Sequence, residues 1–293
     1  MRTFGTNEVP PTRAMRSAGP SVRYRAIFIR NTGRAVMTPR LGQARWDVIP
    51  PGPHPAHMHM ALDEVLLQQV ISGQRPPTMR LWRWIERALV IGSHQSVVNE
   101  VDLEAAEELG FVITRRMSGG GTMLCEPDRT ITYSMYLPDS MVAGISFRKS
   151  YALLDGWAVR AFNELGVPAS YREINDIISP RGKIGGAAQA RRRGFVLHHT
   201  TMAHSMDVEL LPRLIRLGRE RLAERGVRSA EKSVSPLSWF TSLSCDEVAR
   251  KLHAYFTREF NASDAEVSRA ELEMARRLVE SKYSTDDWIN RLP

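Results

Sequence analysis

The chain has 293 residues, and 43% of them are hydrophobic, which is enough to bury a substantial core and argues against intrinsic disorder. Its apolar stretches are far shorter than the roughly 20 residues that span a bilayer, and the N-terminus shows no apolar stretch followed by a cleavage site. The two cysteines, Cys125 and Cys245, are too few for a disulfide framework or a cysteine-based zinc site. We therefore expect a cytoplasmic protein without a membrane segment.

The net charge of +8 comes mostly from arginine and favours an acidic partner: nucleic acid, a nucleotide or an acidic protein surface. Solvated, arginine-rich helix faces explain the same charge equally well. No basic run is interleaved with aromatic residues of the kind that stack on single-stranded bases. We therefore predict no nucleic-acid partner.

Residues 1–45 mix proline, glycine and arginine and are expected to form an N-terminal extension, with one strand candidate at Tyr24–Ile29. From Trp46 onward apolar residues recur with regular spacing, so we expect the main domain to span residues 46–293. Its hydrophobic periodicity alternates between the helical and the extended type. Clustered strands with interspersed helices predict an α+β fold, a mixed and largely antiparallel sheet with helices on one face.

The expected elements rest on apolar spacing, capping residues and glycine stops. In chain order they are a helix through Met58–Val70, strands at Thr78–Trp84 and Ala88–Ile91, a short helix capped by Asp102, strands at Phe111–Arg116 and Thr130–Leu137, a helix from Phe147 to Leu165, a hairpin of Asn175–Ser179 with Lys183–Ala188, and two helices with capping boxes at Ser244–Glu247 and Ser268–Glu271. Thr130–Leu137 alternates apolar and polar residues, as a half-buried strand does.

Three consecutive glycines, Gly119, Gly120 and Gly121, follow a predicted strand and the pair Arg115 and Arg116. Glycines let a ligand approach the backbone amides, and such amides together with an arginine bind anions. No Gly-Lys-Ser/Thr follows, so this is not a P-loop, and the following strand excludes a dinucleotide fingerprint. We predict an anion site here, with a plain hairpin tip as the alternative.

A second glycine-rich segment, Asn175–Gln189, contains a turn and presents Lys183 at the start of a strand. A lone lysine near a turn is usually solvated, but its glycine neighbours leave room for a ligand. Asp176 either helps to hold a magnesium ion or caps the turn. The adjacent His198 and His199 face opposite sides of a strand, so a zinc site from these two is implausible.

Together these segments resemble the lipoate–protein ligase A family, within the biotin/lipoate ligase fold group that is similar to class II synthetases. The resemblance covers about Trp46 to the end. It rests on Met60–Glu64, Leu81–Trp84, Val90–Gln95, the glycine loop, the lysine loop and Lys282–Trp288.

The resemblance implies that lipoate attacks the α-phosphate of ATP, with magnesium, to give lipoyl-AMP, and that the lipoyl group then passes to a lysine of a lipoyl-domain acceptor protein. Lys183 is the implied catalytic residue. The residues implied to bind ATP or lipoyl-AMP are Arg116, Gly119, Gly120, Gly121, Thr122, Met123, Leu124, Asn175, Asp176 and Lys183. Those implied to bind lipoate are Arg83, Gly92, His94, Gln95 and His199.

The sequence departs from the family pattern at three places. Cys125 and Glu126 stand where the family usually has His-Asp, and Thr200 follows His199 where it usually has glycine. The sequence ends at Pro293, without the small accessory domain of many family members. A separate polypeptide is expected to supply that part, unless the N-terminal extension replaces it or the chain does not complete ligation alone.

The main rival is an octanoyl- or lipoyltransferase of the same fold, which needs no ATP and holds the acyl group as a cysteine thioester. In such relatives the cysteine lies shortly before the lysine loop, and Phe162–Tyr171 contains none. Cys125 is either that nucleophile or a buried structural residue. A biotin ligase fits less well, because the lysine loop resembles that of lipoate enzymes, and a non-enzymatic binding protein is a further candidate. We predict the ATP-dependent lipoate–protein ligase.

Overall fold

The computed structural model describes residues 39–292, so the strand candidate at Tyr24–Ile29 and most of the expected extension lie outside the described residues. The first described element is the helix α1 (Pro39–Gln43). Leu41 is buried, and the Trp46 indole donates a hydrogen bond of 3.0 Å to its carbonyl. The residues directly before Trp46 therefore already belong to the packed fold.

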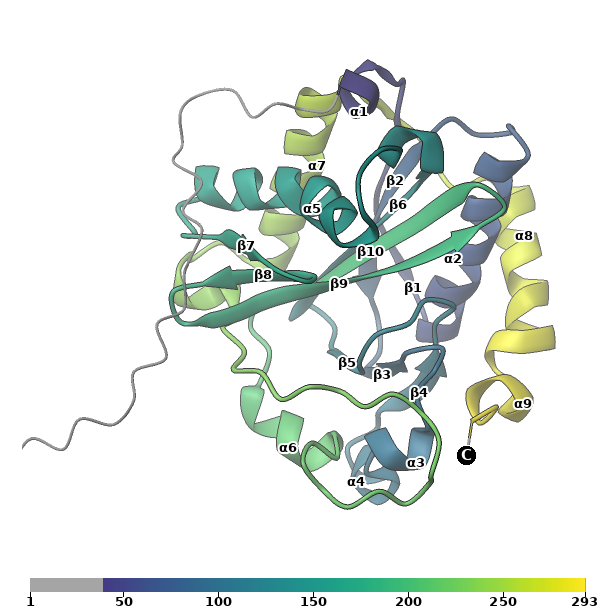
Figure 1. Cartoon of the computed structure of the whole chain (residues 1–293), viewed down its shortest axis with the longest axis vertical. Coiled ribbons are helices and arrows are strands. Elements are labelled where there is room, and N and C mark those ends of the chain that lie inside the picture. Colours follow the sequence, from purple (N-terminus) through teal and green to yellow (C-terminus); the bar gives the residue numbers. More distant parts are fainter. Residues whose placement is uncertain (1–38, 293) are drawn as a thin grey trace, which may run out of the picture. The chain divides into compact units, whose positions relative to one another are not determined.

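Within residues 39–292 the strands form an eight-stranded sheet and a three-stranded sheet (Figure 1). The larger sheet has the order β11 (Ser263–Asp264), β1 (Asp47–His54), β2 (Thr78–Trp84), β6 (Thr130–Pro138), β10 (Phe195–Ala203), β9 (Gly182–Arg192), β8 (Asp176–Ser179) and β7 (Ser170–Arg172). The smaller has the order β4 (Val112–Arg115), β3 (Ala88–Ile91) and β5 (Met123–Cys125). The strands pair antiparallel from β2 to β7, while β1 pairs parallel with both neighbours. This arrangement confirms the predicted fold class.

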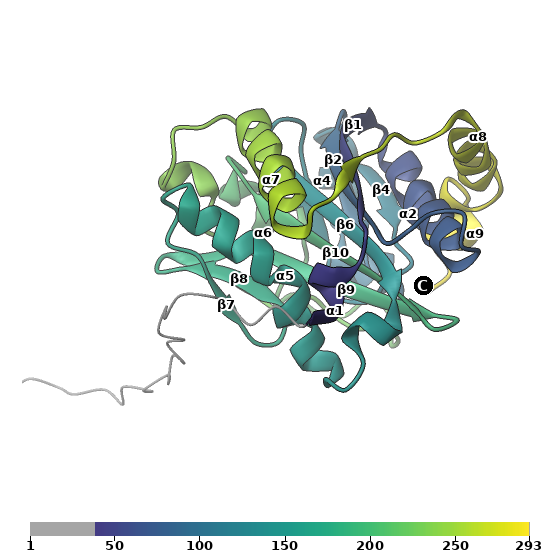
Figure 2. The same ribbon diagram turned by 90° about the horizontal axis from the view of Figure 1, so that it is seen from above.

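Helices cover both faces of the larger sheet, so the prediction of helices on one face is wrong (Figure 2). The helices α5 (Phe147–Glu164) and α7 (Cys245–Phe260) pack on one face. The helix α2 (Ala56–Ile71) packs on the other, and α8 (Arg269–Leu278) packs against α2.

The central strand β6 shows why the sequence suggested a single covered face. Its apolar side chains, such as Ile131 and Met135, join the core under α5 and α7. The alternate Ser134 and Tyr136 face α2, where their hydroxyls donate hydrogen bonds of 2.9 and 2.7 Å to the buried carboxylate of Asp63. Because hydroxyl-bearing residues alternate with apolar ones, a strand buried on both faces has the sequence pattern of a half-buried strand.

Side-chain caps fix the helix starts as predicted. Asp102 accepts a hydrogen bond from the Ala105 amide at the start of α4 (Leu103–Glu108). Both predicted capping boxes are present, at the starts of α7 and α8.

The remaining α-helices within residues 39–292 are the short helices α3 (Val97–Glu100), α6 (Leu211–Leu214) and α9 (Asp286–Ile289). No helix in this range has both the length and the apolarity needed to cross a membrane.

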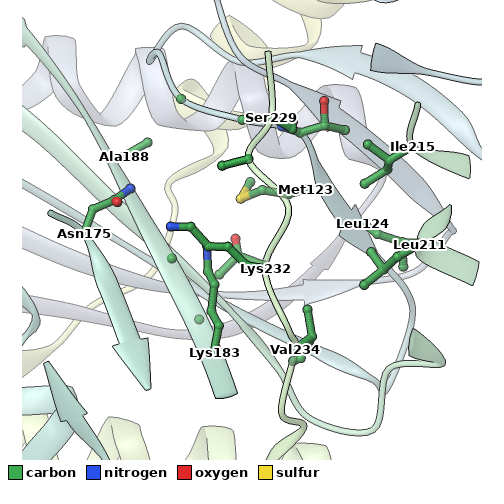
Figure 3. Close-up of a pocket in the computed structure, with 18 of the residues that line it drawn as sticks. Met123, Leu124, Asn175, Lys183, Ala188, Leu211, Ile215, Ser229, Lys232 and Val234 are labelled. Atoms are coloured by element: carbon green, nitrogen blue, oxygen red, sulfur yellow. The ribbon is translucent and has the colours of Figure 1, made fainter. Parts of the chain in front are cut away.

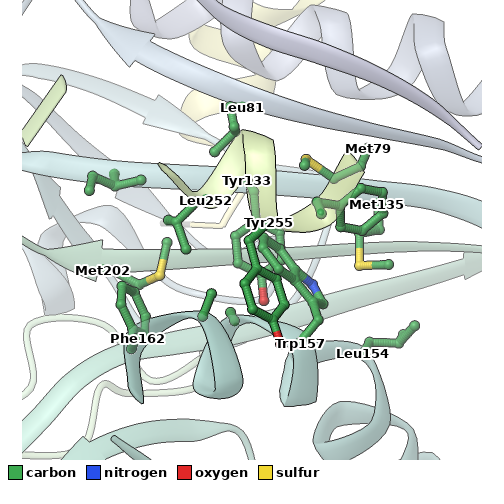
Figure 4. Close-up of a cluster of buried hydrophobic side chains, with 14 of the residues drawn as sticks. Met79, Leu81, Tyr133, Met135, Leu154, Trp157, Phe162, Met202, Leu252 and Tyr255 are labelled. Carbon is green, nitrogen blue, oxygen red and sulfur yellow. The ribbon is translucent and has the colours of Figure 1, made fainter. Parts of the chain in front are cut away.

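The core between the sheet and helices α5 and α7 is centred on aromatic rings (Figure 4). Trp157 of α5 is 1% exposed and lies between two rings, with ring centroids 4.8 Å from Tyr133 and 5.1 Å from Phe256. Such packing anchors α5 and α7 to the strands that carry the candidate site.

Replacing Trp157 by alanine should lower the free energy of unfolding by about 3–5 kcal/mol, because it removes a fully buried aromatic side chain and leaves a cavity. The matched control is Trp239→Ala, since Trp239 is 42% exposed and contacts Arg181 only through a stacked guanidinium. That change should cost at most about 1 kcal/mol. Urea unfolding of both variants measures the difference, and equal costs would contradict the assigned core.

Candidate functional site

The glycine loop joins β4 to β5 and packs against the turn that follows β3. The Ser93 amide donates a hydrogen bond of 2.8 Å to the Ser118 carbonyl. A Cβ atom at Gly92 would lie 2.2 Å from the carbonyl oxygen of Gly120, so only glycine fits there. Gly120 itself has φ +92°, a conformation that favours glycine. Both glycines are therefore needed to bring these two backbones together.

Arg116 organises the glycine loop from within. The side chain is buried, and its guanidinium donates hydrogen bonds to the carbonyls of Val90 (2.9 Å), Gly119 (2.7 Å) and Gly121 (2.7 Å). Burial lowers the pKa of Arg116 to about 10. In this structure the arginine therefore holds carbonyls of the loop and of β3, and its predicted part in anion binding stays a prediction.

The two adjacent histidines of β10 point to opposite faces of the sheet, as predicted. His198 lies 2.8 Å from Asp155 of α5. His199 lies 2.9 Å from Asp63 of α2 through Nδ1 and 2.6 Å from the Ser118 hydroxyl through Nε2. Burial lowers the pKa of His199, and the Asp63 carboxylate opposes that shift. His199 thus connects the glycine loop to the buried polar network beneath it.

Lys183 is the second residue of β9, and the glycines around it leave space for its side chain. Its Nζ lies 3.0 Å from Asp176 Oδ1, and its side chain is 25% exposed. A Cβ atom at Gly186 would lie 2.4 Å from that Nζ, so the ammonium occupies space that any other residue would fill with its side chain. Burial lowers the pKa of Lys183, and the nearby Asp176 carboxylate opposes that shift.

Asp176 is a buried carboxylate with two lysine partners. Besides Lys183, the Nζ of Lys232 donates a hydrogen bond of 2.6 Å to its Oδ2. Burial opposes ionisation, but the charges of Lys183 and Lys232 lower the pKa of Asp176 below its ordinary value. Neighbouring Asn175 donates a hydrogen bond to the Ala187 carbonyl and so holds the turn against β9.

A cavity of about 350 Å³ lies between the glycine loop and the lysine loop (Figure 3). Several of its walls are apolar, including Met123, Leu124, Ile184, Met206, Leu211, Ile215, Leu217, Val227 and Val234. The predicted nucleotide-binding residues that line it are Arg116, Gly120, Gly121, Thr122, Met123, Leu124, Asn175 and Lys183, whereas Gly119 and Asp176 lie outside its lining.

Sequence reasoning missed one wall of this cavity, residues 227–235, which we call the strap. Ser229 of the strap accepts a hydrogen bond of 2.8 Å from the Thr122 amide and lies 2.5 Å from the Glu100 carboxylate. At the other end, Ser233 accepts a hydrogen bond of 2.8 Å from the Lys183 amide. The strap therefore connects the two loops. Its irregular, charged sequence has no periodicity that could have predicted this role.

The residues predicted to bind lipoate do not line the cavity. Arg83 and His94 are exposed, and His199 lies beneath the glycine loop. Gln95 is a brace, because it accepts a hydrogen bond of 2.7 Å from the Gly92 amide and donates one of 3.1 Å to Ser229. Their contact with an acyl group stays a prediction.

Neither cysteine presents a reactive thiol. Cys125 of β5 is fully buried, and burial raises the pKa of its thiol far above the ordinary value. Cys245, the first residue of α7, is also buried, and its pKa is raised to about 12. Since the thiolate is the nucleophile, this environment marks both cysteines as structural.

Comparison with known proteins places this geometry in a family. The model of the lipoyl protein ligase A/B catalytic domain matches residues 55–257. The chain is 30% identical over 271 residues to the octanoyltransferase LipM of Geobacillus kaustophilus, covering 83% of this chain and 97% of that protein. It is 28% identical over 259 residues to the octanoyltransferase LipM of Brevibacillus brevis, covering 79% and 93%. The chain belongs to the lipoyl protein ligase A/B catalytic domain family.

Solved structures agree with this assignment. The bi-partite lipoate protein ligase of Thermoplasma acidophilum, studied with its E2 lipoyl domain, is 25% identical with a TM-score of 0.70, covering 85% of this chain and 98% of that one. A lipoate-protein ligase A bound with ATP shares the fold, with 24% identity, a TM-score of 0.69 and coverage of 84% and 99%.

The sequence relatives correct the main functional expectation. We predicted an ATP-dependent lipoate–protein ligase, but the similar curated proteins, which match across nearly their whole length, are octanoyltransferases. The ligase prediction is therefore wrong, and the transferase alternative is the better supported one. The motifs misled because this chain resembles both proteins named octanoyltransferases and proteins named lipoate ligases.

Replacing Gly186 by alanine tests the place of the Lys183 ammonium. The new methyl group must displace Nζ, and a misplacement of about 1 Å in a catalytic group can cost about 100-fold in rate. We expect a loss of that order with little loss of stability. The matched control is Gly156→Ala in α5, where the new Cβ would meet only the flexible end of Arg160 at 3.4 Å. Equal activity of both variants in a turnover assay would show that Lys183 has no such role.

Proposed function

We propose that this protein is an acyltransferase that moves an octanoyl-class acyl group from a thioester donor to a lysine of a lipoyl-domain acceptor protein. One observation carries the proposal: the Lys183 ammonium borders a cavity whose other walls are largely apolar. The cation can stabilise the negative charge that develops on the carbonyl oxygen of the donor. The apolar walls can bury its hydrocarbon chain, and each buried CH₂ contributes about 0.8 kcal/mol to the binding free energy. The octanoyltransferase relatives support the same assignment.

Acyl transfer is accelerated by a cation or hydrogen-bond donors at the reacting carbonyl. The neutral amine of the acceptor lysine attacks the thioester carbon, and negative charge develops on the carbonyl oxygen. Lys183, already desolvated, is placed to neutralise that charge, which is a large term in acyl transfer. The C–S bond then breaks, the amide forms, and the departing thiolate takes up the proton lost by the amine.

This reaction has no step for ATP or magnesium, because a thioester is already an activated acyl group. It also needs no acyl-enzyme. The sequence has two cysteines, and both thiols are buried with raised pKa values. We therefore propose direct attack by the acceptor lysine while the donor is bound. The separate accessory polypeptide expected for a ligase stays a prediction.

The proposal predicts ATP-independent transfer from an octanoylated carrier protein to an unmodified lipoyl domain, followed by intact mass. Lys183→Met should lower the rate about 100- to 1,000-fold, the usual effect of removing one oxyanion-stabilising donor. Cys125→Ser and Cys245→Ser should retain most of the activity. Strict dependence on ATP would refute the transferase assignment. A hydroxylamine-sensitive acyl adduct on Cys125 would refute direct transfer.

The rate of transfer should depend on pH in two opposite ways. It should rise as the attacking acceptor lysine loses its proton and fall as Lys183 loses its charge. Because burial lowers the pKa of Lys183 from 10.5, the alkaline fall should lie at a lower pH than for a free lysine. In Lys183→Arg the side chain keeps its charge, so the remaining activity should show no alkaline fall. A wild-type rate that rises without limit up to pH 10.5 would contradict this role.

A further inference from the structure

The Lys183 ammonium shares its carboxylate with a second lysine. Asp176 has a side chain that is 2% exposed, with Lys183 Nζ at 3.0 Å from Oδ1 and Lys232 Nζ at 2.6 Å from Oδ2. Arg172 is a third, more distant cation, 3.5 Å from Oδ2 and half exposed. Of the three cations, Lys232 is the one closest to the carboxylate.

The strap holds Lys232 in place independently of the Lys183 side chain. The amide of Lys183 donates a hydrogen bond of 2.8 Å to the Ser233 carbonyl, and the Ser235 amide donates one of 2.7 Å back to the Lys183 carbonyl. Gly182 has φ +141°, and a Cβ there would lie 2.6 Å from the Ser233 carbonyl oxygen. Because these contacts involve the backbone, Lys232 keeps its position when the Lys183 side chain moves.

The arginines of the cavity lining have other partners. Arg116 donates to carbonyls of the glycine loop. Arg228 donates hydrogen bonds of 2.8 and 2.6 Å to the carbonyls of Arg219 and Arg216. Among the described lining residues, Lys183 and Lys232 are therefore the cations that face a carboxylate.

The transfer reaction places two demands on one ammonium group. Lys183 must be held by Asp176 in the free protein and must turn toward the acyl oxygen during reaction. A buried carboxylate that loses its only cation is strongly destabilised, so a lone Lys183 would be locked in place. We propose that Lys232 is a positioning residue that keeps Asp176 paired when Lys183 turns to the acyl carbonyl. This inference rests on the proposed transferase function.

Two other roles for Lys232 give different results in the same experiment. If Lys232 contacts the donor directly, its loss cannot be compensated by a change at Asp176. If it only stabilises the strap, its loss lowers the free energy of unfolding, and a change at Asp176 does not restore kcat. A double-mutant cycle with Asp176 therefore separates the three roles.

The experiment compares Lys232→Met, Asp176→Asn and the double variant in the octanoyl-transfer assay. Lys232→Met should lower kcat about tenfold or more with nearly unchanged KM, because Asp176 then has only the more distant, half-exposed Arg172 besides Lys183 and holds Lys183 more firmly. In the double variant the neutral amide no longer holds Lys183, so kcat should return to within about threefold of the Asp176→Asn value. Lys232→Arg, which still pairs with a carboxylate, should keep most of the activity. The exposed Lys251→Met is the matched control and should match the wild type.

A second readout follows Lys183 without any turnover. Reductive ¹³C-methylation of the lysines, with Lys183 assigned from Lys183→Arg, lets NMR follow its titration. In Lys232→Met the pKa of Lys183 should rise, since the nearer of its two positively charged neighbours at Asp176 is gone. No recovery of kcat in the double variant, or an unchanged Lys183 titration, would overturn the role of Lys232. Absence of wild-type transfer would instead overturn the proposed function, so the two failures are distinguishable.

Discussion

The ion pair between Lys183 and the buried carboxylate of Asp176 is the interaction on which the candidate site depends. A lysine near the start of a strand is normally solvated. Here its ammonium pairs with a carboxylate in the neighbouring strand β8. The absent side chain of Gly186 leaves the space for its ammonium. Burial makes this cation more effective at a developing oxyanion than a solvated lysine, because little water competes for the charge. Desolvation also lowers the pKa of Lys183, so the proposed activity should depend on pH.

In the proposed reaction the rest of the site would hold the acyl group beside that cation. The glycine loop, the lysine loop and the strap come from distant parts of the chain, and Ser229 and Ser233 of the strap bond to one loop each. The cavity has Lys183 and Lys232 at one side and apolar side chains along its other walls. Within the described residues neither cysteine thiol is accessible. In this family the same frame occurs in proteins named ligases and proteins named octanoyltransferases. In the proposed reaction the acyl group arrives as a thioester.

Much of the fold was predictable because local signals set it. Asp102, the capping boxes and the glycine stops mark helix ends by hydrogen bonds between near neighbours, and β2 and β3 begin and end at the predicted residues. Burial of β6 on both faces was hidden by the hydroxyl groups that satisfy Asp63. The strap depends on contacts between distant segments, which no local pattern encodes, and residue types alone do not show that the Arg116 guanidinium turns to the carbonyls of its own loop. No local sequence pattern identified the kind of acyl donor, so the motifs alone suggested the wrong reaction.

The most direct test of the account is a crystal structure with a ketone analogue of an octanoyl thioester, in which CH₂ replaces the sulfur. The account predicts the ketone oxygen within about 3.2 Å of Lys183 Nζ, at hydrogen-bonding distance. It also predicts that Asp176 keeps its contact with Lys232. An analogue bound with its ketone oxygen away from Lys183, while Lys183 still pairs with Asp176, would contradict the assignment of Lys183 as the group that stabilises the reacting carbonyl.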